Sequence, residues 1–166
     1  GPRLIVEQVR PLLADNAAIL DAGAGTGAVG LVAREAGFTT MDAMDLSLDM
    51  LEIAREHGIY RDIRVGVLGQ ALDYETDSYD AVLSAGVFTP GHAPPEGLDE
   101  LVRIVKPGGA ICFTLRHDVT PPGFTEAFER LTGEGRWERA HVSEPFQGMP
   151  GGDPEVRHRV WLFNVV

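Results

Sequence analysis

The stretch that decides the fold is Ile19-Leu20-Asp21-Ala22-Gly23-Ala24-Gly25-Thr26-Gly27. The apolar run of residues 17–21 predicts a short buried strand, and the glycines after it predict a tight turn that opens a helix over residues 27–36. Glycine permits positive φ and lets a ligand approach the main chain closely, and the first turn of a helix offers unpaired N–H groups. Such a turn, at the carboxyl end of the first strand, is the usual ligand site of an open α/β sheet.

The glycines alone leave the ligand open. Gly25, Gly27 and Gly30 also spell the dinucleotide pattern G-x-G-x-x-G, and Asp45 follows at the distance expected of a ribose-binding acid. The motif therefore suits a nicotinamide enzyme or an enzyme that uses S-adenosylmethionine (SAM). A strand-to-helix turn that binds nothing is a third alternative.

Strand and helix patterns alternate along the chain. Alternating units predict a parallel, doubly wound sheet, and two closing strands joined only by a loop predict an antiparallel addition. We expect an α/β, Rossmann-like sheet of seven strands in the order 3-2-1-4-5-7-6, mostly parallel with the C-terminal strand antiparallel. The predicted strands are residues 17–21, 39–44, 63–67, 79–84, 110–115, 137–142 and 156–165, and the predicted helices are residues 4–14, 27–36, 47–57 with Ser47 as N-cap, 96–105 and 125–131.

Three further features resemble the class I SAM-dependent methyltransferases. Asp21 precedes the glycines and gives D-x-G-x-G-x-G, Asp42-Ala43-Met44-Asp45-Leu46-Ser47 leads into Met50-Leu51 and a helix, and Arg103-Ile104-Val105-Lys106-Pro107-Gly108-Gly109 joins a helix to the fifth strand. More narrowly, four segments are similar to the methyltransferase-like family that includes the protein from the Williams–Beuren syndrome region. They are Leu68-Gly69-Gln70, Asp77-Ser78-Tyr79-Asp80, Gly86-Val87-Phe88-Thr89 and Pro94-Pro95.

The resemblance implies SAM as cofactor, with S-adenosylhomocysteine as product, and gives each acid a role. Asp21 would lie near the amino group of SAM, directly or through water. Asp45 would take the two ribose hydroxyls, because a carboxylate can accept from both at once. The resemblance also assigns contacts to other parts of the cofactor. The methionine part would lie against Gly23, Ala24, Gly25 and Gly27, and its end would meet Ser84 and Ala85. The faces of the adenine would contact Leu46 and Met50, and its edge would contact Leu68 and Gly69.

The sequence departs from the family pattern at Val67 and in the helices expected before Leu4, and the role assigned to Met50 has an alternative. Val67 stands where many relatives carry an acid suited to the adenine amino group. In relatives, one or more helices precede the helix that Leu4 begins, and they close over SAM. We therefore expect a single methyltransferase domain over residues 1–166 that lacks these lid helices. Met50 equally fits a core methionine at helical spacing.

Composition narrows the function classes. The formal net charge of −11 opposes nonspecific binding to phosphate backbones, so we expect a small-molecule or protein acceptor rather than a nucleic acid. No apolar run approaches the roughly 20 residues of a membrane span, and no signal-peptide pattern opens the sequence, so cytoplasm is the expected location.

Cys112, the only cysteine, lies in an apolar run and is expected to be a buried structural thiol. We expect no metal.

Histidines are the candidates for a general base, which methyl transfer needs only when the nucleophile arrives protonated. His92 follows Thr89-Pro90-Gly91 beyond the fourth strand and is the first candidate, although an exposed loop histidine fits the same position. His117, beside Asp118, is a weaker second. His141 and His158 fall in the closing strands and are expected to have no catalytic role.

Residues at single positions argue against two other classes of enzyme. A short-chain dehydrogenase needs a Tyr-x-x-x-Lys pair, but Val102 stands four residues before Lys106, the only lysine. An amino-directed DNA methyltransferase would carry Asn/Asp-Pro-Pro-aromatic where this chain has Ser84-Ala85-Gly86-Val87. A non-catalytic module that binds SAM, or nothing, stays open, and the missing lid and Val67 favour it.

Overall fold

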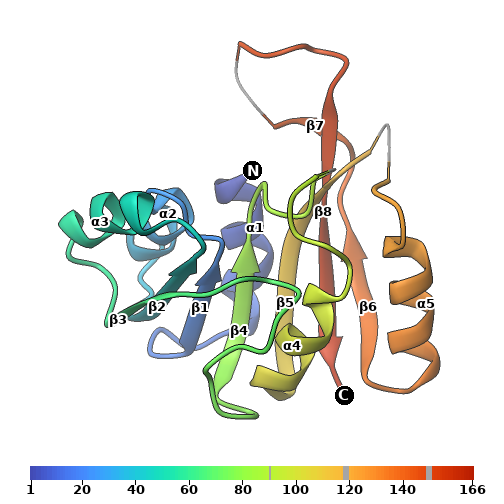
Figure 1. Cartoon of the computed structure of the whole chain (residues 1–166), viewed down its shortest axis with the longest axis horizontal. Coiled ribbons are helices and arrows are strands. Elements are labelled where there is room, and N and C mark those ends of the chain that lie inside the picture. The colour runs from blue at the N-terminus through green and yellow to red at the C-terminus, as the bar shows by residue number, and fades with distance from the viewer. Residues whose placement is uncertain (90, 118–119, 149–150) are drawn as a thin grey trace.

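The strands form one sheet in the order predicted from the sequence. The computed structural model describes residues 1–89, 91–117, 120–148 and 151–166. Its strands are β1 (Ala18–Ala22), β2 (Thr40–Asp45), β3 (Asp62–Val65), β4 (Tyr79–Ser84), β5 (Val105–Arg116), β6 (Trp137–Val142), β7 (Phe146–Gln147) and β8 (Arg157–Val165). They lie in the order β3-β2-β1-β4-β5-β8-β6, with β7 paired to β8 (Figure 1).

Strand direction also follows the prediction. The first five strands are parallel, and β8 runs antiparallel to both β5 and β6. The two-residue strand β7 is an addition that the sequence pattern did not indicate. The strand β5 begins at Val105, five residues earlier than expected; Val105 pairs with Tyr79 of β4, and the register then shifts before Ala110 pairs with Ala81.

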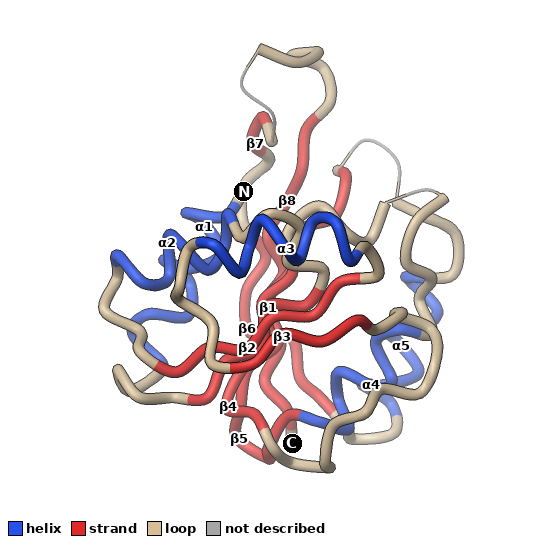
Figure 2. Tube along the Cα trace, turned by 60° about the vertical axis from the view of Figure 1, so that its left-hand side comes forward, coloured by secondary structure: helices blue, strands red, loops and turns tan. Residues whose placement is uncertain are grey.

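Helices cover both faces of the sheet (Figure 2). They are α1 (Pro2–Val9), followed by the 3-10 turn η1 (Arg10–Leu12), α2 (Ala28–Glu35), α3 (Leu48–Glu56), α4 (Gly97–Ile104) and α5 (Phe124–Gly133). Ser47 caps α3 as predicted, because its hydroxyl accepts a hydrogen bond of 3.3 Å from the amide of Met50. The first helix, expected over residues 4–14, ends at Val9, because Pro11 lacks an amide and clashes with a continuing helix.

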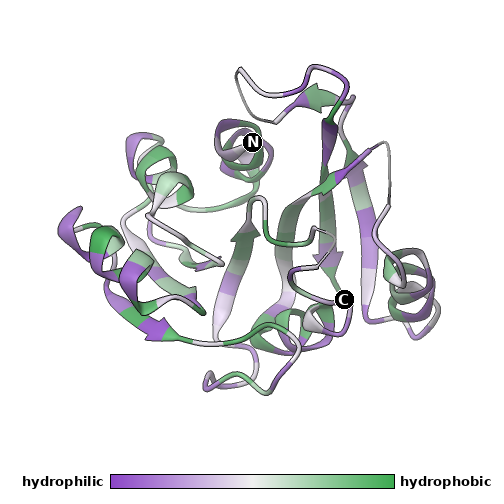
Figure 3. Ribbon diagram, turned by 45° about the horizontal axis from the view of Figure 1, so that its top comes forward, coloured by the Kyte–Doolittle hydropathy of each residue, from purple (hydrophilic) through white to green (hydrophobic). Residues whose placement is uncertain are grey.

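Two apolar layers hold the helices to the sheet. Ile5, Val6 and Val9 of α1 pack with Ile19 of β1 on the face that α1, α2 and α3 cover. Leu20 points to the opposite face, where α4 and α5 pack. Successive strand residues alternate between the faces, and the helices alternate hydrophobic and hydrophilic residues along their length (Figure 3). Cys112 is fully buried, as expected, and burial raises the pKa of its thiol.

Within the described ranges, every helix is too short or too polar to cross a membrane.

Candidate functional site

The glycine-rich loop joins the end of β1 to the start of α2 and is fastened to β2. Gly23, Gly25 and Gly27 all have positive φ, at 74°, 56° and 99°. The amides of Gly23 and Ala24 donate to the carbonyl of Met44 at 2.8 and 2.9 Å. These bonds draw the loop toward the end of β2, where Asp45 lies.

Asp45 fastens the same loop through its side chain. Its Oδ2 accepts a hydrogen bond of 2.8 Å from the amide of Gly25, and its Oδ1 accepts one of 2.9 Å from the amide of Ser47. Each carboxylate oxygen has a second lone pair, and the side chain is only half-buried. Asp45 can therefore accept hydroxyl donors from a ligand while it holds the loop.

Asp21 is buried beneath the loop with half of its carboxylate unsatisfied. The residue is 2% exposed, and Oδ2 accepts a hydrogen bond of 2.6 Å from the hydroxyl of Tyr60. Oδ1 has no hydrogen-bond partner among the residues that the structure describes. Burial raises the pKa of Asp21 to about 6, although the hydrogen bond from Tyr60 and the nearby amide of Gly30 oppose that rise. Since buried polar atoms are normally paired, Oδ1 fits a cationic group of a ligand or a water that bridges to it.

Two side chains that the sequence analysis missed support the loop. Tyr60 follows α3 and places its hydroxyl against Asp21, and Nε2 of His57 lies 2.9 Å from the carbonyl of Thr26. The only signal in the sequence was an aromatic residue between the stop of one helix and the next strand. That pattern does not tell which face of the sheet the ring will occupy.

The residues assigned to the adenine differ in exposure. Leu46 is 71% exposed and Met50 is 46% exposed, so the alternative of Met50 as a core residue is wrong. A Cβ on Gly25 would lie 3.8 Å from Sδ of Met50, so this side chain borders the loop. Leu68 is buried in the core, which leaves its backbone for a ligand. Gly69 follows it with φ at 101°.

A cavity of about 300 Å³ adjoins the loop. The ends of β4 and β5 contribute Ala85 and Thr114, and the hydroxyl of Thr114 accepts a hydrogen bond of 2.8 Å from the amide of Gly86. The lining residues are Gly1, Pro2, Gly23, Ala24, Ala28, Val29, Ala85, Gly86, Thr89, Thr114, Phe146, Gly148 and His158.

The assigned residues at this end of the sheet do not all line the cavity. Gly23, Ala24 and Ala85 line it. Ser84 is buried behind it at 1% exposure, with Oγ unpaired in the described part of the chain. His158, for which no catalytic role was expected, also lies on the cavity wall.

The other candidate histidines lie outside the cavity lining. Nδ1 of His92 is 2.7 Å from Oγ1 of Thr89, which does line the cavity. Nδ1 of His117 accepts a hydrogen bond of 3.0 Å from Arg159. Asp118, its expected neighbour, and Pro90 lie outside the described residues. His141 is exposed on β6.

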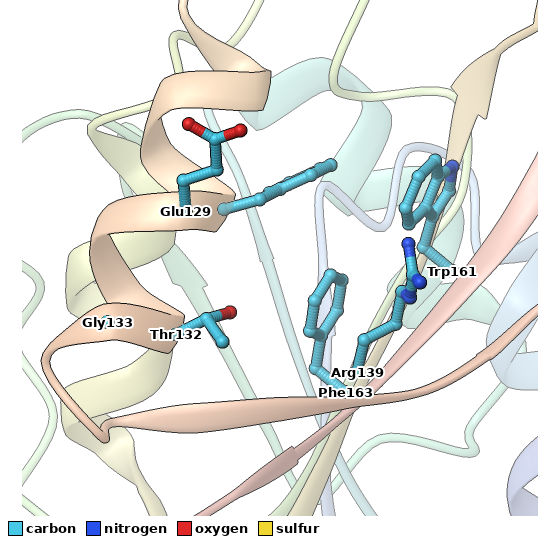
Figure 4. Close-up of a pocket in the computed structure, with 7 residues that line it drawn as sticks. Glu129, Thr132, Gly133, Arg139, Trp161 and Phe163 are labelled. Carbon is cyan, nitrogen blue, oxygen red and sulfur yellow. The ribbon is translucent and has the colours of Figure 1, made fainter.

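A second cavity, of about 460 Å³, lies between α5 and the strands β6 and β8 (Figure 4). Phe128, Trp161 and Phe163 form its apolar part, and Arg139 reaches along it toward Trp161. No residue of the glycine loop lines it, so it belongs to a different part of the surface.

The site fits SAM and offers no metal set. Asp21 can receive an ammonium group, Asp45 can receive hydroxyls, and the glycines leave room for a ligand against the main chain. A group of three or more His, Cys, Asp and Glu side chains that could hold a metal ion is absent from the described ranges.

Comparison with known proteins adds independent support. Residues 20–113 match the methyltransferase domain family. The chain is 37% identical to human methyltransferase-like protein 27 in an alignment of 146 positions that covers 83% of this chain and 59% of that protein. It is 34% identical to the malonyl-[acyl-carrier protein] O-methyltransferase of Pectobacterium atrosepticum over 122 residues, which are 73% of this chain and 47% of that enzyme.

The fold is shared with solved methyltransferases. A TehB-like SAM-dependent methyltransferase from Corynebacterium glutamicum superposes with a TM-score of 0.74 at 22% identity, covering 97% of this chain and 86% of that one. The chain spans about half the length of the curated relatives it matches. By its sequence and its fold, the chain belongs to the methyltransferase domain family of class I SAM-dependent methyltransferases.

Proposed function

We propose that this domain binds SAM and transfers its methyl group to a small-molecule acceptor. The observation that carries the proposal is the pair of acids at the ends of β1 and β2. Asp21 has an unsatisfied buried oxygen, and each carboxylate oxygen of Asp45 keeps a lone pair beside the one that accepts from a backbone amide. Placed on either side of an open glycine loop, they suit the ammonium group and the ribose hydroxyls of SAM.

In such a reaction the protein binds the cofactor and the acceptor, orients them toward each other and excludes water. SAM, when bound, supplies an electrophilic methyl group on a sulfonium. Asp21 would hold the ammonium group and Asp45 the ribose of the cofactor, and Leu46 and Met50 would give the adenine an apolar border. The cavity of about 300 Å³ beside the loop would hold the methionine end of SAM against Gly23, Ala24 and Ala85, with the acceptor toward Thr89.

Proton removal from the acceptor has one route that the contacts favour. Thr89 lines the cavity, and its hydroxyl lies 2.7 Å from Nδ1 of His92. An acceptor proton can pass to Thr89 as the Thr89 proton passes to an unprotonated Nδ1. His92 would then act from outside the cavity as the general base.

The acceptor class rests on charge and size. A net charge of −11 disfavours a nucleic acid, and the cavity suits a small molecule. The finer relationship, to the methyltransferase-like family that includes the protein from the Williams–Beuren syndrome region, is supported by the match to human methyltransferase-like protein 27. A cytoplasmic location also stays a prediction.

One observation favours a second candidate, a module that binds SAM without catalysis. Val67, at the position of the usual adenine-binding acid, is 39% exposed and brings no carboxylate. Fold and family alone do not decide between a binder and an enzyme.

Calorimetry with SAM and with S-adenosylhomocysteine tests the binding proposal. Turnover with radiolabelled SAM against a panel of small-molecule acceptors tests the transfer. Binding with turnover supports the enzyme, and binding without turnover on any acceptor favours the second candidate. No binding of either compound, by a folded chain, would refute both.

A further inference from the structure

Tyr60, which is half-buried, and Asp21, which is buried, form a hydrogen-bonded pair behind the glycine loop. The Tyr60 hydroxyl donates to Oδ2 of Asp21 over 2.6 Å, while Oδ1 of Asp21 has no partner among the described residues. Tyr60 lies in the segment between α3 and β3, so this bond joins the segment after α3 to the end of β1. The ring of Tyr60 packs against the apolar clusters on this face of the sheet, which include Ala43 and Leu51, so its hydroxyl is the part that reaches Asp21.

The chain has made room for that hydroxyl at Gly30. A Cβ on Gly30 would lie 2.1 Å from the Tyr60 oxygen and 2.5 Å from Cζ. Gly30 lies inside α2 without positive φ, so its backbone conformation suits any residue. The glycine at this position therefore serves the approach of Tyr60, and the third glycine of the apparent dinucleotide pattern is explained without a dinucleotide.

We propose that Tyr60 is a positioning residue of the cofactor site, whose hydroxyl holds Oδ2 of Asp21 so that Oδ1 is left to the ammonium group of SAM. The inference rests on the proposed function. A carboxylate with both oxygens free could rotate away from the cofactor. One held by a charge-assisted hydrogen bond of 2.6 Å presents a fixed acceptor.

The groups around Asp21 determine how its charge responds to pH. Burial raises its pKa to about 6, and the nearby charge of Asp45 adds to that rise. The Tyr60 hydroxyl and the Gly30 amide, at the positive end of α2, oppose the rise. Its sheet neighbours Ala43 and Leu83 carry no charge. The buried residues of α1 in the same layer, Ile5, Val6 and Val9, carry none either. His57, at the end of α3, is the other titratable group at the loop and bonds to the Thr26 carbonyl.

The test is the pH dependence of SAM affinity in Tyr60→Phe, measured by calorimetry and expressed as the ratio of its Kd to that of the unmodified chain at each pH. This ratio cancels the titration of SAM itself. Loss of the hydroxyl raises the pKa of Asp21 further. We expect binding about 5- to 10-fold weaker at pH 6.5 and within about twofold at pH 8.5, because Asp21 is ionised in both proteins there.

Tyr79→Phe is the matched control. Tyr79 donates an equal bond of 2.6 Å to Oδ2 of Asp42, and neither residue belongs to the loop or lines the cavity. Its Kd ratio should stay near one at every pH. If SAM binds the unmodified chain but Tyr60→Phe gives a pH-independent ratio, the positioning role is wrong while the proposed function stands. If the unmodified chain does not bind SAM, the proposed function itself fails.

Discussion

The amide of Gly25 donates a hydrogen bond of 2.8 Å to Oδ2 of Asp45, and this bond ties the glycine loop to the end of β2. Asp45 thus has a structural task beside the proposed one. Asp45→Ala should weaken SAM binding by about 1.5–3 kcal/mol, the usual value of hydrogen bonds to a charged group. Calorimetry measures the loss. An unchanged affinity in a folded variant would exclude Asp45 as the ribose acid.

Asp45→Asn separates the two tasks. The amide keeps one oxygen for a backbone donor but cannot accept at both of its terminal atoms. We expect SAM binding to fall in Asn as in Ala, while thermal unfolding of the Asn variant stays closer to that of the unmodified chain. Equal destabilisation by Ala and Asn would mean that the loop needs both bonds, to Gly25 and to Ser47.

The sequence was sufficient for features with a local cause. Glycines after an apolar run predicted the loop, Ser47 predicted the start of α3, and alternation predicted the strand order. The pairing of Tyr60 with Asp21 could not be predicted, because it joins residues 39 apart through the packing of α3 on the sheet. His158 reaches the cavity for a similar reason, since its place depends on the register of β8 against β5.

Asp21→Asn should stabilise the ligand-free chain and weaken SAM binding at the same time. Burial raises the pKa of Asp21 from 3.8 to about 6, so the folded state bears an unfavourable charge above that pH. Removing it should raise the free energy of unfolding at pH 7 by up to about 3 kcal/mol, as a shift of this size implies. Urea unfolding and SAM calorimetry at pH 7 measure the two effects.

The sign of the pH dependence checks the cause. Between about pH 4 and 6 the folded chain binds more protons at Asp21 than the unfolded chain, so this group adds stability as pH falls. The advantage of Asp21→Asn should therefore shrink from pH 7 to pH 4. An Asn variant that is less stable than the unmodified chain at pH 7 would contradict an uncompensated buried charge.

Arg61→Ala should destabilise the chain most at neutral pH. Burial alone would raise the pKa of Asp42, but bonds from Arg61 and Tyr79 together hold it below its ordinary value of 3.8. The bridge therefore stabilises the fold above about pH 4, and its contribution is lost as pH falls through the lowered pKa. Since Arg61 is 58% exposed, we expect a loss of only about 1–2 kcal/mol at pH 7. Urea unfolding between pH 7 and pH 3 measures it.

The matched control is Arg64→Ala. Arg64 pairs with Asp62, which is 42% exposed, on the edge strand β3. Solvent screens that pair, so its loss should cost less than about 1 kcal/mol at any pH. Equal losses in the two variants would show that the burial of Asp42 does not strengthen its bond to Arg61.

Gly30→Ala should reverse the usual effect of alanine in a helix. Replacing a helical glycine by alanine normally stabilises by up to about 1 kcal/mol. At Gly30 the new Cβ would meet the Tyr60 oxygen at 2.1 Å, so Tyr60 must move and Asp21 loses its donor. We expect this overpacking to lower the free energy of unfolding by about 1–3 kcal/mol and to weaken SAM binding.

Gly133→Ala, at the end of α5, is the control, because a Cβ there meets nothing within 4 Å. It should be neutral or stabilising by a few tenths of a kcal/mol, with SAM affinity unchanged. Stabilisation by both substitutions in thermal unfolding would mean that Tyr60 can leave Asp21 at no cost.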